Sequence, residues 1–135
     1  MAMDFSKLGT QQVNVGTNEP NLVPTRIRTL SNVVHISAGS WHAAAVTSTG
    51  EVFTWGYNYY GQLGRAEGVA THNYNYVPTK VNGLSAIVGV EAGFWHTTVL
   101  KSDNTMYSFG YNESGQLGYE TTNEANYVPK IINIF

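Results

Sequence analysis

Apolar and polar residues alternate along short segments of the chain, with the two-residue period that β-strands show. Val34 and Ile36 share one face of the segment 33–38, and Phe53 and Trp55 share one face of a later segment. No apolar stripe with the 3.6-residue period of a helix continues over three turns. The pattern predicts β-strands at residues 33–38, 42–47, 51–56, 76–82, 87–92, 96–101, 105–110 and 127–133.

Short polar segments and prolines separate these predicted strands. Residues 48–50 (Ser-Thr-Gly) and 102–104 (Ser-Asp-Asn) lie between apolar runs and indicate hairpin turns. Pro24, Pro78 and Pro129 begin segments that favour an edge strand, because proline donates no hydrogen bond to a β-ladder.

A repeat with an offset of 54 residues organises the sequence. Four motifs recur at this offset: Val-Pro-Thr at 23–25 and 77–79, Ala-Gly-x-Trp-His at 38–42 and 92–96, Gly-Tyr-Asn at 56–58 and 110–112, and Gly-Gln-Leu-Gly at 61–64 and 115–118. One structural unit is therefore expected twice, with partial copies on either side. The predicted division is an N-terminal partial repeat with an outer strand at 1–32, a first blade at 33–82 and a second blade at 87–134.

Four antiparallel strands in a repeat of about 50 residues are typical of a β-propeller blade. The ordered motifs Ala-Gly-x-x-His, Trp/Phe-Gly-Tyr-Asn, Gly-Gln-Leu-Gly and Val-Pro resemble the repeat of the regulator of chromosome condensation (RCC) family, over about residues 6–134. The resemblance implies a propeller, seven-bladed in the best-known members. Two blades cannot close a ring, so the expected fold is all-β, with blades of four antiparallel strands in an incomplete ring.

The recurring glycines, histidines and glutamines are interpreted as structural. A glycine at the start of a sharp turn permits a positive φ or a close approach between backbones. The glutamine amides are expected to hold the following loop, and Leu63 and Leu117 to fill the gap between blades. The predicted structural residues are Gly39, His42, Gly56, Gly61, Gln62, Gly64, Gly93, His96, Gly110, Gly115, Gln116 and Gly118.

His42 and His96 occupy equivalent positions and allow two interpretations. A metal site is disfavoured because zinc needs three or four suitable ligands and the sequence has no cysteine. We favour half-buried rings whose nitrogens bond backbone groups of the same or the next blade. Trp41 and Trp95 also recur, as packing residues or, less favoured, as a stacking platform for a base or a sugar. His35 is expected at the surface.

The sequence offers no catalytic constellation. It lacks the Gly-x-Ser-x-Gly motif of a nucleophile elbow, and the glycine-rich stretch 56–64 is not followed by a helix that could bind phosphate. We therefore expect no enzyme activity, no cofactor and no metal.

Tyrosines and the variable loops are the best sequence evidence for binding. Loops 65–76 and 119–127 differ between the repeats and are rich in Tyr, Asn and Thr, which is typical of adaptable recognition surfaces. The alternative, equally weighted, is that tyrosine only covers strand edges. The candidate interaction residues are Tyr57, Tyr59, Tyr60, Tyr74, Tyr76, Tyr111, Tyr119 and Tyr127.

Charge and hydropathy narrow the classes of partner. Seven Lys and Arg against nine Asp and Glu give a net charge of -2, which argues against a nucleic-acid partner. The start of the chain lacks the apolar core of a signal peptide, and no apolar run is long enough to cross a membrane. These patterns favour an intracellular protein without naming a compartment.

The predicted function is a non-catalytic protein–protein interaction module that self-associates into a ring. The resemblance also implies alternatives, because the family includes a guanine-nucleotide exchange factor for a small GTPase, chromatin binders, ubiquitin-ligase accessory domains and an inhibitor of β-lactamases. The chain is alternatively part of such an exchange factor, or a structural subunit of a larger assembly. The expected partner is a second copy or the remainder of a longer propeller. Residues 22–30 are expected to pair with a neighbour as a latch.

Overall fold

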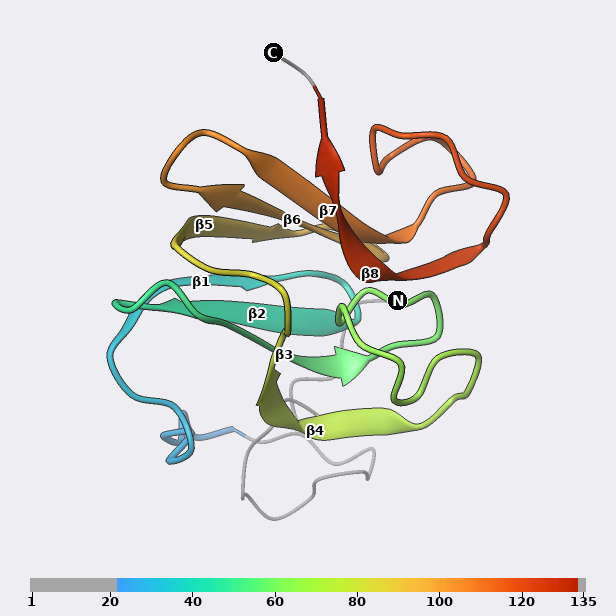
Figure 1. Cartoon of the computed structure of the whole chain (residues 1–135). Helices are drawn as coiled ribbons and strands as arrows, with labels where there is room; N and C mark the ends of the chain where they lie inside the picture. The colour runs from blue at the N-terminus through green and yellow to red at the C-terminus, as the bar shows by residue number, and fades with distance from the viewer. Residues whose placement is uncertain (1–21, 134–135) are drawn as a thin grey trace.

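The computed structural model describes residues 22–133, which form eight β-strands and no helix. The strands make two antiparallel four-stranded sheets, ordered β1-β2-β3-β4 and β5-β6-β7-β8, which are stacked side by side (Figure 1). The predicted all-β fold of four-stranded blades in an incomplete ring is confirmed. We call the sheets blade 1, β1 (Val33–Ala38), β2 (His42–Thr47), β3 (Val52–Tyr57) and β4 (Tyr74–Lys80), and blade 2, β5 (Ile87–Ala92), β6 (His96–Lys101), β7 (Met106–Tyr111) and β8 (Ala125–Ile132).

The inner strands have the predicted bounds, whereas the outer two strands of each blade are shifted by one or two residues. In blade 1 the third strand continues to Tyr57, whose amide donates to the carbonyl of Trp41 and whose partner across the ladder is Tyr74. This pairing also starts β4 two residues before the predicted position. A register shift between Thr54 and Gly56 lets the ladder continue on both sides of the irregularity.

The hairpin between the second and third strands uses a left-handed residue at the same place in both blades. Gly50 has a φ of 79° in blade 1, and Asn104 has a φ of 69° in blade 2. Asparagine tolerates this conformation better than most residues with a side chain. The repeat therefore conserves the backbone conformation of this turn while the residue type changes.

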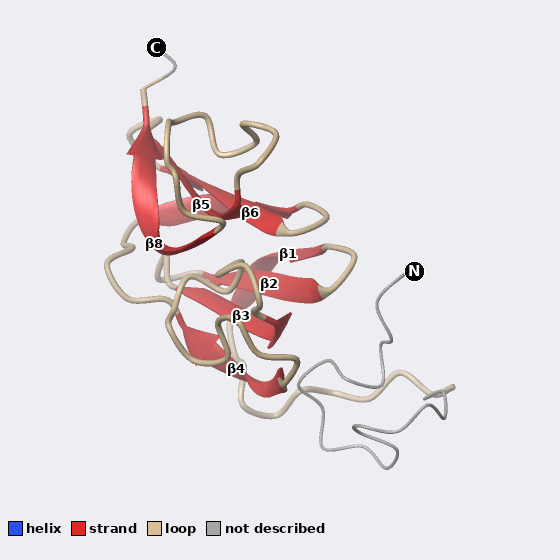
Figure 2. Cartoon of the chain, turned by 90° about the vertical axis from the view of Figure 1, so that its right-hand side faces the viewer, coloured by secondary structure: helices blue, strands red, loops and turns tan. Residues whose placement is uncertain are grey.

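The two blades lie next to each other (Figure 2). The larger hydrophobic core lies between them, where alternate residues of each sheet meet. Each buried valine, leucine, isoleucine or phenylalanine side chain of this core contributes about 1.5–3 kcal/mol by leaving water. One face of each blade is used in this contact, so alternate residues of a strand point into it. The alternating residues Val34 and Ile36 of β1 are not part of it and are exposed. The core residues are Ala44, Val46, Val52, Val81 and Leu84 of blade 1 and its connection, and Ile87, Val90, Val99 and Phe109 of blade 2.

Close backbone approach explains the glycines at the inner turns, and a positive φ does not. Neither Gly39 nor Gly93 has a positive φ, contrary to one of the sequence expectations. A Cβ on Gly39 would overlap the carbonyl oxygen of Gly93, and a Cβ on Gly93 would overlap the ring of His96. Glycine is needed here because the two blades and the histidine rings converge at this point. The later motif glycines do have positive φ angles: Gly56, Gly61, Gly64, Gly110, Gly115 and Gly118.

Candidate interaction surfaces

A buried chain of hydrogen bonds connects blade 1 to blade 2 at His42. The Nε2 atom of His42 lies 2.7 Å from the hydroxyl oxygen of Thr97, and that hydroxyl donates at 2.7 Å to the main-chain carbonyl of Gln62. A threonine hydroxyl has one hydrogen, so Thr97 must accept the bond from His42. His42 therefore carries its proton on Nε2. Its partner is a side chain of the next blade, whereas the sequence suggested a backbone group.

Burial controls the charge of this histidine. His42 is fully buried, and the loss of solvation lowers its pKa to about 3, with a smaller contribution from His96. The ring is consequently neutral near pH 7, which matches its role as a hydrogen-bond donor to an uncharged hydroxyl.

His96 occupies the equivalent place in blade 2 but has no such partner. Its ring makes no hydrogen bond among residues 22–133, and it is half-buried where His42 is enclosed. Partial burial lowers its pKa as well. The carbonyl of Gln116, which corresponds to that of Gln62, likewise accepts no hydrogen bond within the described part of the chain.

Asparagine holds the loop after the third strand, a role that the sequence analysis assigned to glutamine. The amide of Asn58 accepts from the main chain of Leu63 at 2.8 Å and donates to the carbonyls of Arg65 and Glu67. Gln62 instead accepts from the main chain of Tyr60, on the preceding side. Asn112 stands at the same repeat position in blade 2 and makes equivalent bonds to Leu117 and Tyr119. The recurrence of this asparagine is the sequence signal that could have identified its role.

A polar strip joins the innermost strands β1 and β5. His35, which the sequence placed at the surface, bonds from Nε2 to the carbonyl of Val90 at 2.9 Å. Ser37 accepts from the main chain of Ala92 at 2.9 Å and faces the carboxylate of Glu91. These contacts are specific to this pair of blades, because Gly89 and Glu91 stand at the corresponding positions of blade 2.

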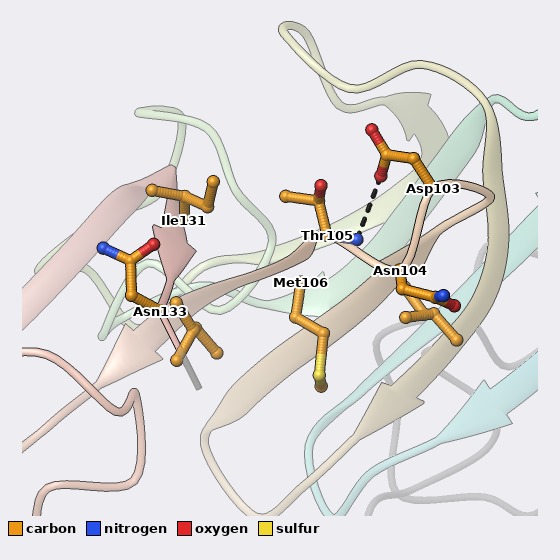
Figure 3. Close-up of a pocket in the computed structure, with 8 residues that line it drawn as sticks. Asp103, Asn104, Thr105, Met106, Ile131 and Asn133 are labelled. Carbon is orange, nitrogen blue, oxygen red and sulfur yellow. Dashed lines mark hydrogen bonds between the residues drawn. The ribbon is translucent and has the colours of Figure 1, made fainter. Parts of the chain in front are cut away.

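Blade 2 presents an open face on the side away from blade 1, which we call the trailing flank (Thr98, Leu100, Met106 and Ile132). It borders a hollow of about 610 Å³ (Figure 3). The equivalent of Thr98 and Leu100 in blade 1 is the pair Ala44 and Val46, which is fully buried against blade 2. Gly61 shows the same contrast, because it packs on the backbone of Tyr127 whereas its copy Gly115 faces open space.

Blade 1 presents the complementary face, the leading flank (Ile36, Ala43, Ala45 and Trp55), on which Ile36 is exposed whereas the other three are buried with Ile27 and Leu30 packed against them. A groove of about 440 Å³ runs along it, and Ile36 is 71 % exposed. Ile27 and Leu30 pack on this face in the places that Val81 and Leu84 take beside blade 2. The segment 22–30 therefore corresponds to the connection between blades.

Aromatic rings form a continuous surface across both blades, which we call the aromatic surface. Tyr60 of blade 1 joins its two halves, with ring centroids 5.0 Å from Trp95 and 4.6 Å from Tyr111 of blade 2. Ring contacts connect ten members in all: Trp41, Tyr57, Tyr59, Tyr60, His72, Tyr74, Tyr76, Phe94, Trp95 and Tyr111.

Six of the eight candidate tyrosines thus come together, and two lie apart from the network. Tyr119 instead lies under the ammonium group of Lys130, 4.6 Å from its ring centroid, and Tyr127 is exposed on β8. His72 and the exposed Phe94 also belong to this surface, although no sequence pattern indicated them. Trp95, interpreted from the sequence as a packing residue, contacts Phe94 and Tyr111 and therefore belongs to the same surface.

Two classes of site are absent from the described residues. No group of three or more His, Asp or Glu side chains among residues 22–133 could hold a metal ion. None of the described segments forms a helix with the length and apolar character to cross a membrane.

Comparison with known proteins identifies the repeat over nearly the whole chain. The model of the regulator of chromosome condensation (RCC1) repeat matches residues 4–46, 49–100 and 103–135, and a second model of the same repeat matches 33–62 and 87–116.

Relatives with curated functions are considerably longer than this chain. The ultraviolet-B receptor UVR8 of Arabidopsis thaliana is 32% identical over 130 residues, covering 95% of the chain and 28% of the receptor. The probable E3 ubiquitin-protein ligase HERC4 of Homo sapiens is 33% identical over 120 residues, covering 87% of the chain and 11% of the ligase. The chain therefore spans less than a third of either relative.

Solved structures show the same fold. Human WBSCR16 matches with a TM-score of 0.65 and 25% identity, over 74% of this chain and 25% of that protein. Yeast RCC1 (Prp20), in a structure bound to Kap60, matches with a TM-score of 0.71 and 21% identity, over 97% of this chain and 31% of that protein.

Proposed function

Because the chain belongs to the regulator of chromosome condensation (RCC1) repeat family, we propose that it is a non-catalytic protein–protein interaction module whose blades associate head to tail. The proposal rests on one observation. The two outer flanks, of which the leading flank is partly covered by Ile27 and Leu30, present equivalents of the two surfaces that already pack together between blade 1 and blade 2.

The equivalence extends to the individual positions of the core. Ile36 and Trp55 of the leading flank correspond to Val90 and Phe109, and Leu100 of the trailing flank corresponds to Val46. Apolar faces of this kind are stabilised by contact with a matching face, and repeat proteins derive much of their stability from such neighbour interfaces. We propose a second copy of the chain as the partner, in a heterologous contact that closes into a ring.

Two flank variants test this arrangement because head-to-tail contact needs one intact flank from each partner. Leu100→Asp removes the trailing flank and Ile36→Asp removes the leading flank. We expect the natural chain to exceed its monomer mass of 14.8 kDa in light scattering, and each variant to be monomeric. A mixture of the two variants should form a dimer, since each retains the flank that the other lacks.

A matched control is Val77→Asp, at an exposed valine of β4 that borders neither flank groove. This variant should associate like the natural chain. A natural chain that stays at monomer mass at several hundred micromolar contradicts the proposal. Failure of the mixed variants to combine contradicts the head-to-tail geometry alone.

We propose the aromatic surface as the site for a different protein partner. Its support is the continuity of ten rings over two blades and the 50 % exposure of Phe94 at its border. Aromatic side chains are enriched at the centres of protein interfaces because they bury a large area with few rotatable bonds.

A further inference from the structure

The trailing flank of blade 2 repeats the two groups, a histidine ring and a glutamine main-chain carbonyl, that bind a hydroxyl between the two blades. In the filled copy, His42 and the carbonyl of Gln62 in blade 1 hold the hydroxyl of Thr97 in blade 2. In the other copy, the His96 ring and the carbonyl of Gln116 stand at the same offset, and neither has a partner among the described residues.

We infer that His96 and the Gln116 carbonyl form a receptor for one side-chain hydroxyl, supplied by Thr or Ser at the Thr97 position of an incoming propeller blade. The inference rests on the proposed head-to-tail contact and names the feature of an incoming blade that would strengthen it. The donor and acceptor are complementary to a hydroxyl, which offers one hydrogen and two lone pairs.

The leading flank of this chain lacks that hydroxyl. The residue equivalent to Thr97 in blade 1 is Ala43, which borders the leading-flank groove. A second copy therefore supplies the apolar part of the contact and leaves His96 and Gln116 without their partner. A site built to hydrogen-bond a hydroxyl discriminates against a group that lacks it, because burial leaves the polar atoms unpaired.

The charge state of His96 is suited to this role. The pKa of the ring is lowered by partial burial, so the imidazole is neutral near pH 7 and can donate from one nitrogen, as His42 does. Complete burial by a partner increases this desolvation further. A hydroxyl is therefore a better partner than a carboxylate, which would favour the protonated ring.

Substitution of Ala43 converts the second copy into the matching partner. Ala43→Thr adds the hydroxyl, and Ala43→Val adds the same bulk without it, so the comparison isolates the hydrogen bonds. Both residues suit a β-strand. Sedimentation velocity of each chain over a range of concentrations measures the association constant. We expect the Thr variant to associate roughly ten-fold more tightly than the Val variant, the size of effect that one satisfied buried polar group gives.

The same comparison in the His96→Ala background tests whether His96 binds the hydroxyl. There the Thr and Val variants should associate equally. Equal association in the natural background overturns the receptor while leaving the proposed function intact. If only the Thr variant associates, the receptor is supported and the proposed self-association of the natural chain is overturned. No association of any variant at several hundred micromolar overturns both.

Discussion

His42 is held in a single charge state and tautomer by its neighbours. Nε2 donates to Thr97, while Nδ1 is buried and has no hydrogen-bond partner among the described residues. A second proton on Nδ1 would add a buried positive charge and an unsatisfied N–H group. Both effects oppose protonation, which accounts for a pKa of about 3 in the folded chain.

This histidine should make stability depend on pH. Its folded pKa, about 3, lies below the ordinary value of 6.5, so the unfolded chain binds the proton first as the pH falls. The stabilising contribution is complete above pH 6.5 and decreases from there towards pH 3, by up to about 1.4 kcal/mol per pH unit. Urea unfolding at pH 7 and pH 5 measures this loss.

His42→Gln provides the control, because a glutamine amide keeps a donor near Nε2 and does not titrate in this range. The free energy of unfolding of this variant should change less between pH 7 and pH 5 than that of the natural chain, by about 2 kcal/mol. Equal pH dependence in the two proteins would show that His42 is protonated in the folded state.

The recurrence of a histidine predicted a structural role but could not identify its partner. His42 bonds to Thr97, which lies outside its own repeat, and the first repeat has Ala43 where the second has Thr97. Alignment of two repeats emphasises identities, whereas a contact between blades pairs different positions of successive units. Such a contact becomes visible only when the blades are placed in space.

At the level of elements, strands were predictable and loop contacts were not. The apolar segments and the turns between them placed β1, β2, β5 and β6 at their observed bounds, although burial differs among these strands, since every residue of β2 is buried and none of β1 is. The bounds of β3 and β4 depend on a register shift near Gly56, which no local pattern records. Asn58 and Gln62 have similar amide groups, so only geometry shows which one holds the following loop.

The aromatic surface contains residues that pack and residues that remain available. Tyr60→Ala removes two ring contacts between the blades and should lower the free energy of unfolding by about 2 kcal/mol. Phe94→Ala removes one contact of a side chain that is half exposed, so its loss should be below about 1 kcal/mol. Thermal or urea unfolding compares the two variants.

Equal losses would show that Phe94 is as enclosed as Tyr60 in solution. The expected difference has a practical consequence for binding. Phe94→Ala is the variant that can weaken a protein partner of the aromatic surface without unfolding the blades, whereas Tyr60→Ala confounds the two effects.

The whole molecule has two equivalent apolar faces, one packed between the blades and the other on the leading flank. Leu84 and Leu30 are equivalent residues of the repeat. Leu84 is 6 % exposed in the core between the blades, and Leu30 is only partly buried on the leading flank. In the proposed head-to-tail contact, Leu30 would acquire the environment that Leu84 has within the chain. Because the two leucines occupy the same position of the repeat, a difference between their effects on stability reports the difference between their surroundings.

Leucine-to-alanine substitution at these two positions should therefore affect different properties. Leu84→Ala leaves a cavity in a packed core and should lower the free energy of unfolding by about 2–5 kcal/mol. Leu30→Ala should cost about 1 kcal/mol in the isolated chain, because part of its side chain is already in water, but should weaken self-association, which buries it. Urea unfolding at low concentration gives the first quantity and sedimentation at high concentration the second. Equal unfolding losses for the two variants would mean that the leading flank is already covered within a single chain, which would remove the reason for one copy to seek another.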